Sequence, residues 1–238
     1  MRLFVRITTC FAVVSALLAG AGNRVVAQSS TAPATSTNGT YVAIDPLAKV
    51  RYDNRYDVSV GLGYDHAKAG PTILSGSNLG GLDISGSYWF AKHWGAEGSA
   101  RGYFGSSGVG TGNNTALNYQ KGQAINQFFI VAGPEWLGPH NKHGDLMAHV
   151  MGGAAYGHFE GNLHGLTAQN VAFYNDQLAP AAIIGGHIDL NRNEHWVFRI
   201  TPDAVMTHYS INYAPNTSQF DVNFAISVGL EYKFRKKR

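Results

Sequence analysis

His208 and Ser210 are the best candidates in the sequence for nucleophilic catalysis. A serine hydroxyl attacks an acyl carbonyl only when a neighbouring base accepts its proton, and a carboxylate usually orients that base. Residues two apart in an extended segment point to the same side, so both side chains would share a lipid-facing or core face with Met206. A hydrolase that uses His208 as base and Ser210 as nucleophile is therefore one activity to consider.

Charged residues form a second candidate group, because they recur at alternating positions beside Gly, Ser and Ala. They are Arg55, Asp57, Asp83, Glu97, Arg101, Glu135, Asp189, Arg199, Asp203 and Glu231. Small residues mixed with charges of both signs are typical of a crowded barrel interior. An unpaired buried charge is strongly destabilising, so we expect these residues to form an internal network of ion pairs. A narrow path for ions or protons along the same residues is the alternative.

Histidine and cysteine do not form a recognisable metal-binding pattern. His66, His158, His164 and His208 fall on or near long connecting segments, and His140 and His143 share a short one. None of these groups has the carboxylate or cysteine spacing of a metal site, and the one cysteine is Cys10. No phosphate-binding glycine motif precedes a helix. We therefore expect no metal and no cofactor.

Alternating apolar and polar residues predict the elements that position these side chains. From residue 55 onward the period is two, which is typical of strands with one apolar face. We predict eight strands, at 55–65, 80–90, 94–104, 123–136, 145–159, 179–190, 196–207 and 221–234. No apolar stripe at helical spacing persists, so no helix is expected.

The connections between these segments alternate in length. The long ones are 66–79, 105–122, 160–178 and 208–219, and the short ones are 91–93, 137–144 and 191–195. Strands of about ten residues are long enough to cross a bilayer when tilted. Only a closed barrel leaves no unpaired strand edge in lipid, and bacterial barrels have even strand numbers with short periplasmic turns. The sequence therefore predicts an all-β, antiparallel, up-and-down transmembrane barrel of eight strands.

Aromatic residues lie on the apolar face beside the short connections. They are Trp94, Trp136, Trp196, Tyr232 and Phe234. Such a girdle marks a membrane interface, and it favours apolar faces that point outward to lipid. Trp89 is an exception, because its position in the alternation turns it inward. A secreted soluble β-protein, whose apolar faces would form its core, remains the alternative.

The N-terminal residues predict export. Arg2 and Arg6 precede a short apolar stretch over 10–19, and a Val-x-Ala cleavage pattern ends at Ala27, which together are typical of a cleaved signal peptide over 1–27. A polar linker follows over 28–50, then the barrel over 51–234 and a basic tail over 235–238. Without the signal peptide the chain has equal numbers of acidic and basic residues, so it lacks the basic face that nucleic-acid binding requires.

The C-terminal strand resembles the signal that the barrel-assembly machinery of Gram-negative bacteria reads. The matching residues are Ser227, Gly229, Tyr232 and Phe234, although the chain continues to Arg238. The whole span from 55 to 234 resembles the small outer-membrane barrels of the OmpA-like superfamily. This resemblance implies an outer-membrane location and, as partners, the assembly machinery, membrane lipids and lipopolysaccharide.

The resemblance indicates architecture rather than activity. We expect a structural role or binding of an unidentified surface ligand through the long extracellular loops, with no enzymatic activity. We also expect no wide pore, because the interior of an eight-stranded barrel is just wide enough for side chains to fill. The alternative is hydrolysis, since His208-Tyr-Ser210 resembles the His-x-Ser pair of lipid A deacylases. In those enzymes an acid follows the pair, but the matching position here is Val222, and the adjacent Asp221 has the opposite parity.

Overall fold

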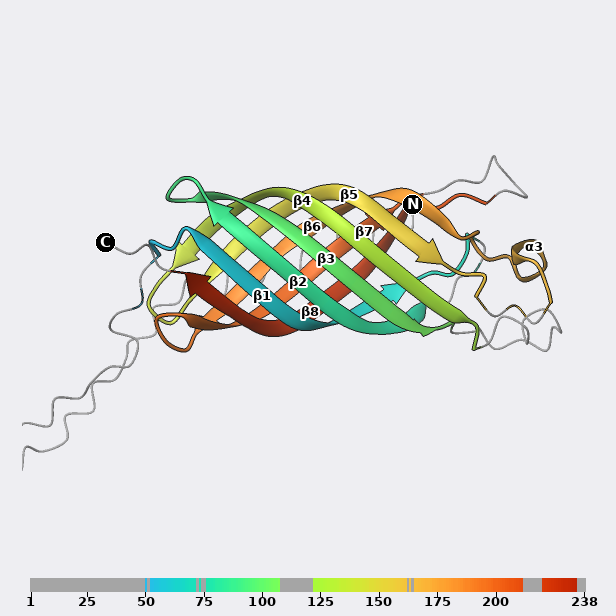
Figure 1. Cartoon of the computed structure of the whole chain (residues 1–238), viewed down its shortest axis with the longest axis horizontal. Helices are drawn as coiled ribbons and strands as arrows, with labels where there is room; N and C mark the ends of the chain where they lie inside the picture. Colours follow the sequence, from blue (N-terminus) through green and yellow to red (C-terminus); the bar gives the residue numbers. More distant parts are fainter. Residues whose placement is uncertain are drawn as a thin grey trace, which may run out of the picture. The chain divides into compact units, whose positions relative to one another are not determined.

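The computed structural model describes residues 50, 52–71, 73, 76–107, 122–161, 163, 165–211 and 220–234. Within these residues, eight antiparallel strands pair in sequence order and β8 closes onto β1 (Figure 1). The strands are β1 (Tyr56–Ala67), β2 (Ser77–Trp89), β3 (Trp94–Ser106), β4 (Ala124–His140), β5 (Gly144–His158), β6 (Gln177–Asn191), β7 (Trp196–Thr207) and β8 (Asp221–Phe234). The predicted fold class and strand number are confirmed.

The alternating connections define two ends of the barrel. The turn end carries the short connections 90–93, 141–143 and 192–195, and the loop end carries 68–76, 107–123, 159–176 and 208–220. Several strands are longer than predicted, mainly because their ladders continue past the alternating segment; β2, for example, begins at Ser77 and β4 ends at His140. The signal peptide, the linker up to residue 49 and the basic tail lie outside the described residues.

One short helix, α3 (Ala168–Val171), lies in the connection between β5 and β6, where no helix was expected. Thr167 caps it: the Thr167 side chain accepts from the Asn170 backbone, and the Asn170 side chain accepts from the Thr167 backbone. A single turn held by its cap leaves no apolar periodicity in the sequence, which explains the omission. In the described part of the chain, no helix is both long and apolar enough to span a membrane.

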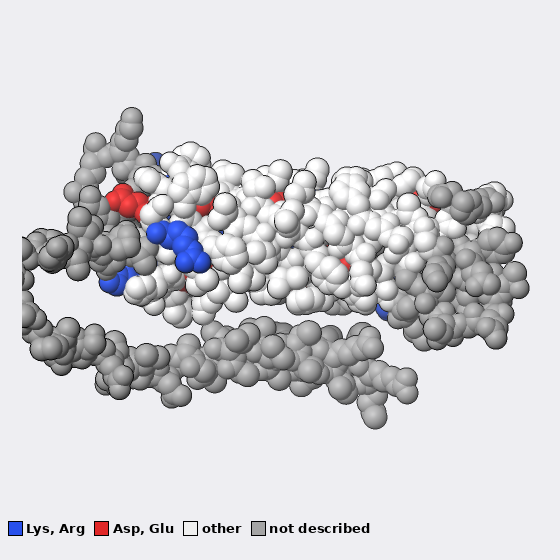
Figure 2. Space-filling view, turned by 90° about the horizontal axis from the view of Figure 1, so that it is seen from below, with Lys and Arg blue, Asp and Glu red and all other residues white. Residues whose placement is uncertain are grey.

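The two faces of every strand differ in a way that soluble proteins do not show. Every Asp, Glu, Lys and Arg side chain within the eight strands is buried. Large apolar side chains point outward instead, such as Leu62 and Ile130, which are 72% and 75% exposed. Figure 2 shows the resulting wall, almost free of charge between its two ends. The apolar faces therefore point away from the interior, as a lipid-facing wall requires.

Aromatic side chains border this apolar wall at both ends. At the turn end, Trp94 pairs in register with Trp136, and the Trp196 and Tyr232 rings lie 5.1 Å apart. At the loop end the exposed aromatics are Tyr64, Phe104, Phe128, Tyr156, Phe220 and Phe224. Aliphatic side chains lie between the two belts, so the wall has the aromatic–aliphatic–aromatic order of a membrane-spanning barrel. The belt at the loop end was not predicted.

The loop-end half of the interior holds most of the buried apolar side chains, beside polar ones such as Asp65 and Gln127. Its centre is a group of rings that we call the aromatic plug: Tyr103, Phe129, Phe159, Tyr174 and Tyr209. Within the plug the centroids of the Phe159 and Tyr209 rings are 5.1 Å apart, and those of Tyr103 and Phe129 are 5.9 Å apart. Tyr103 and Phe129 of the plug belong to strands, whereas the other three rings belong to connections. The Tyr174 backbone N–H also donates to the Ala69 carbonyl at 2.9 Å, which links two of the connections to each other.

Tyr52, just before β1, lies at the turn end. Its hydroxyl donates to the Asn141 carbonyl at 2.6 Å and accepts from Asn191 Nδ2 at 2.7 Å. Lys233 Nζ lies 5.0 Å from the centroid of the Tyr52 ring. Burial raises the pKa of the Tyr52 hydroxyl above its ordinary value, so it remains a donor. Tyr52 thus ties the lead-in segment to the mouth of the barrel.

Candidate functional site

The turn-end half of the interior is a charged network in three tiers. Each tier joins side chains from neighbouring strands and from strands on opposite sides of the barrel. The first tier is centred on Arg199 of β7. Its guanidinium binds Asp189 of β6 through two hydrogen bonds of 2.8 Å and lies 3.0 Å from Glu231 of β8. Asp189 and Arg199 are register partners, so the ladder itself positions this bidentate pair.

Lys233 of β8 extends this tier toward the turn end. Its ammonium is 3.2 Å from Asp145 of β5 and 3.7 Å from Glu231. Although it is only one residue from the end of β8, the Lys233 side chain is buried. Its inward position follows from the same alternation that turns Tyr232 and Phe234 outward.

Arg101 of β3 forms the tier nearest the aromatic plug. It lies 3.4 Å from its register partner Asp83 of β2 and reaches across the barrel to Asp203 of β7 at 2.5 Å. Ser99 and Ser227 both donate to Asp83 at 3.0 Å. This tier therefore connects opposite walls of the barrel through one guanidinium.

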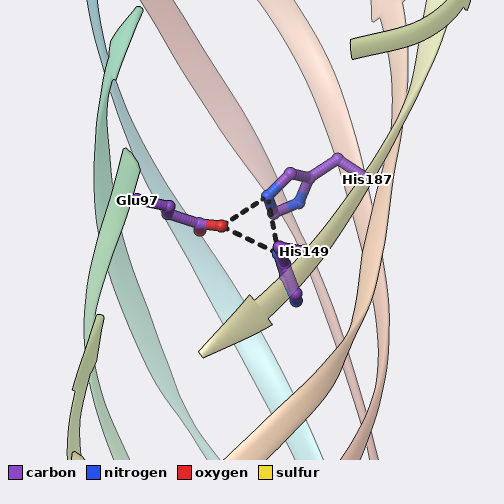
Figure 3. A group of neighbouring side chains, drawn as sticks. All are labelled: Glu97, His149 and His187. Atoms are coloured by element: carbon purple, nitrogen blue, oxygen red, sulfur yellow. Dashed lines mark hydrogen bonds and ion pairs between the residues drawn. The ribbon is translucent and has the colours of Figure 1, made fainter. Parts of the chain in front are cut away.

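Between these tiers, Glu97 of β3, His149 of β5 and His187 of β6 converge on one point (Figure 3). Glu97 Oε2 is 2.8 Å from His149 Nδ1 and 3.2 Å from His187 Nε2, and these two nitrogens are 3.2 Å apart. All three side chains are buried. The other nitrogen of each ring also has a partner: His149 Nε2 is 3.0 Å from Asp203 Oδ1, and His187 Nδ1 is 2.8 Å from Thr201 Oγ1.

The structure places most of the predicted network residues in this interior, but their partners differ. Asp57 accepts hydrogen bonds from Trp89 Nε1 at 2.6 Å and from Asn54 at 3.0 Å, so it contacts neutral donors. Glu135 lies 3.6 Å from His187 Nε2, and neither of its oxygens has a hydrogen-bond partner among the described residues. The inward prediction for Trp89 is confirmed.

Arg55 was wrongly placed in the network. It is exposed, and its guanidinium lies 5.8 Å from the centroid of the Tyr88 ring. The reason is that β1 begins at Tyr56, so residue 55 precedes the ladder whose alternation would turn it inward.

Four residues that join the interior network were not predicted as members of it: Asp145, His149, His187 and Lys233. The alternation of apolar and polar residues already placed all four on the polar faces of their strands. Their contacts depend on how side chains from non-adjacent strands reach across the barrel. Alternation within one strand does not predict which residues of other strands a side chain contacts.

His208 and Ser210 are half-buried in the connection after β7. Ser210 Oγ donates to Gln177 Oε1 at 2.9 Å, and the His208 ring lies 4.4 Å from that of Phe220. In the described part of the chain, no hydrogen bond joins His208 to Ser210. Asp221 binds the Tyr174 hydroxyl and lies 3.6 Å from Lys68 Nζ. The three groups therefore have partners other than one another.

The residues of the predicted assembly signal take part in closing the barrel. A side chain at Gly229 would place its Cβ 2.2 Å from the Val60 carbonyl oxygen, so β8 approaches β1 too closely for any residue but glycine. Ser227 points inward to Asp83, whereas the Tyr232 and Phe234 rings lie outside, 4.9 Å apart. Ser227 and the two aromatic residues therefore lie on opposite sides of the barrel wall.

No protein-family model matches the chain, and no curated protein matches it. Among solved structures it is similar to Ail, the attachment invasion locus protein of Yersinia pestis, at 15% identity and a TM-score of 0.45, covering 76% of this chain and 99% of that one. The outer membrane protein OprG of Pseudomonas aeruginosa is 14% identical, with a TM-score of 0.46 and coverage of 79% and 99%. Neisserial surface protein A is 11% identical, with a TM-score of 0.47 and coverage of 75% and 97%.

The class of protein follows from the features of this chain itself. A closed antiparallel barrel of eight strands has an apolar outer wall, aromatic belts at both ends and all its strand charges inside. That combination defines an integral membrane β-barrel of the outer-membrane type.

Proposed function

We propose that the protein resides in the bacterial outer membrane, reached by export with a cleaved signal peptide, and has a structural or surface-binding role. The main support for this location is that every charged side chain of the strands is buried behind an apolar outer wall. Water would not stabilise such a wall, and the outer membrane is where bacteria place closed barrels. Membrane lipids and lipopolysaccharide are the expected partners of the wall, and the barrel-assembly machinery would insert it.

The connections at the loop end are the proposed binding surface. The connection between β5 and β6 is held in shape by Asp176, which accepts from the backbone N–H groups of Phe159 and Glu160 at 2.6 and 2.8 Å. His158 Nδ1 lies 2.5 Å from the same carboxylate, and Asn175 donates to Glu160 at 2.6 Å. A connection with this much internal bonding presents a preformed surface, which lowers the entropic cost of binding a ligand.

The interior supports a barrel without a wide pore. An eight-stranded barrel is just wide enough for side chains to fill, and here the charged tiers, the aromatic plug and Tyr52 occupy its length. A narrow proton or ion path is the second candidate, because buried carboxylate oxygens of Asp65, Glu135 and Glu231 lack hydrogen-bond partners among the described residues. Planar-bilayer recordings distinguish the two: we expect no current above that of the protein-free bilayer, whereas small ion or proton currents would establish the narrow path.

Fractionation tests the location. The full-length chain, expressed in a Gram-negative host, should appear in the outer-membrane fraction and migrate faster in unboiled than in boiled gel samples. Recovery as a soluble periplasmic protein with a single mobility would contradict the proposal.

We further propose that His208 and Ser210 do not form a catalytic pair. The contact of Ser210 Oγ with Gln177 supports this, since it engages the hydroxyl that a base would have to activate. Mass spectrometry of lipid A from the expressing host should show no change. Deacylated lipid A that disappears with Ser210→Ala would instead establish the hydrolase.

A further inference from the structure

We propose that the barrel interior binds one divalent transition-metal ion between Glu97, His149 and His187. These three side chains come from β3, β5 and β6, and each presents one atom to the same point (Figure 3). The site is distinct from the loop-end surface proposed above and does not depend on that function.

The distances within the cluster fit the coordination shell of an ion. Imidazole nitrogen and carboxylate oxygen bind such ions at about 2.1 Å, which holds neighbouring ligand atoms roughly 3.0–3.4 Å apart. The three separations here are 2.8, 3.2 and 3.2 Å. The ligand atoms are therefore already spaced nearly as an ion would hold them.

Each ring presents a lone pair to this point when it is neutral and carries its proton on the other nitrogen, where a hydrogen-bond partner lies. His149 Nε2 lies 3.0 Å from the Asp203 carboxylate, and His187 Nδ1 lies 2.8 Å from Thr201 Oγ1. A neutral imidazole that donates from one nitrogen presents a lone pair on the other. His149 Nδ1, His187 Nε2 and Glu97 Oε2 are then three acceptors at close range, which only a cation or protons can hold together. Such outer partners are the usual support of metal-binding histidines.

The charge of the interior also favours a cation. Its buried acidic side chains are Asp57, Asp65, Asp83, Glu97, Glu135, Asp145, Asp189, Asp203, Asp221 and Glu231. Against these ten, the strands bury only three permanently charged bases: Arg101, Arg199 and Lys233. Uncompensated charge is costly away from bulk water, so bound cations would stabilise this interior.

Glu135 supplies a second carboxylate beside the cluster. Its Oε1 atom lies 3.6 Å from His187 Nε2, its side chain is fully buried, and neither oxygen has a hydrogen-bond partner among the described residues. A small shift of this side chain would make it a fourth ligand. A set of two imidazoles and one or two carboxylates suits Zn²⁺, Co²⁺, Fe²⁺ or Mn²⁺ better than Ca²⁺ or Mg²⁺, which prefer oxygen ligands throughout.

The test measures metal content and ligand field in the full-length barrel without an affinity tag. The protein is refolded into detergent micelles with Zn²⁺ or with Co²⁺, and free metal is then removed. We expect about one equivalent of Zn²⁺ per barrel by mass spectrometry of the metal. The Co²⁺ form should show d–d absorption of a protein-bound ion rather than that of the hydrated ion.

Two double variants localise the ion. His149→Gln with His187→Gln should lower the Zn²⁺ content at least tenfold. His93→Ala with His140→Ala removes a histidine pair at the turn end, with ring centroids 5.9 Å apart, and should leave the content unchanged. The mobility of unboiled samples in gels shows whether each variant folds. If the His149/His187 double variant does not fold, the nearly isosteric Glu97→Gln replaces it in the metal-content measurement.

Three results would overturn the proposal: a wild-type barrel without bound Zn²⁺, equal metal content in wild type and the folded interior variants, or a loss confined to the His93/His140 variant. The first would mean that protons alone hold the cluster together. Fractionation to the outer membrane is independent of all three results, so a failure here leaves the proposed location standing.

Discussion

Within the interior, single side chains hold distant strands together, and Arg101 shows this most clearly. It joins Asp83 of β2 to Asp203 of β7 through one guanidinium. Asp203 in turn contacts His149, so Arg101 also supports the Glu97–His149–His187 cluster. Removing one partner of such a buried arrangement leaves a charge without compensation.

Arg101→Ala should therefore destabilise the barrel strongly. We expect a loss of about 3–5 kcal/mol in the free energy of unfolding, the range for breaking a buried ion pair. Urea unfolding in lipid vesicles measures it. The matched control is Arg55→Ala, which removes an exposed arginine outside the ladder and should change stability by less than about 0.5 kcal/mol. Equal effects of the two variants would mean that the Arg101 contacts contribute no net stability.

Gly185 lies against Asp203 in the interior, where there is no space for a larger side chain. A Cβ at Gly185 would lie 1.9 Å from Asp203 Oδ1 and 2.5 Å from the Pro202 carbonyl, whereas one at Gly152 meets nothing within 4 Å. Gly185→Ala should destabilise the barrel by about 1–3 kcal/mol, as overpacking does, and Gly152→Ala should be nearly neutral. Unfolding midpoints of the two variants measure the difference, and a neutral Gly185→Ala would show that Asp203 moves aside without cost.

At the scale of the strands, alternation predicts which side of the wall a residue faces, and the structure shows how far that rule extends. It assigns Asp57 to the interior and Val58 to the wall, because both lie inside β1. It fails for Arg55, one residue before the ladder, since only paired backbone is held in the pleat. The alternation rule also does not predict α3, because its single turn depends on the Thr167 cap rather than on a pattern of apolar residues.

A charged substitution in the outer wall distinguishes a wall that faces lipid from one that faces water. Val60 is exposed and lies midway along β1 between two exposed tyrosines, Tyr56 at the turn end and Tyr64 at the loop end. Val60→Arg should cost about 2–4 kcal/mol near the middle of a bilayer, whereas an exposed position in a soluble protein tolerates arginine. Unfolding in lipid vesicles measures this cost.

Leu178→Arg is the control for that variant. Leu178 is 72% exposed and is the second residue of β6, at the loop end. Near the interface an arginine costs only about 0–1 kcal/mol. If both substitutions were neutral, the wall would not face lipid.

At the scale of the whole molecule, the interior divides into an aromatic plug at the loop end and charged tiers toward the turn end. The charged residues could be predicted as a group, because charge is conspicuous on a strand with small neighbours. The plug could not, because Phe159, Tyr174 and Tyr209 belong to connections whose path no periodicity describes. The meeting of Glu97, His149 and His187 also escaped prediction, since it depends on three strands that are not all neighbours.

The central claim is that lipid, not water, stabilises the outer wall of this barrel. The most direct measurement refolds the full-length chain from urea in parallel into detergent micelles and into buffer without detergent, and compares unboiled gel mobility. We expect a fast-migrating, heat-sensitive form in micelles and none in buffer, because the exposed apolar wall requires an apolar solvent. The same folded form in detergent-free buffer would contradict this claim and would establish a soluble β-protein.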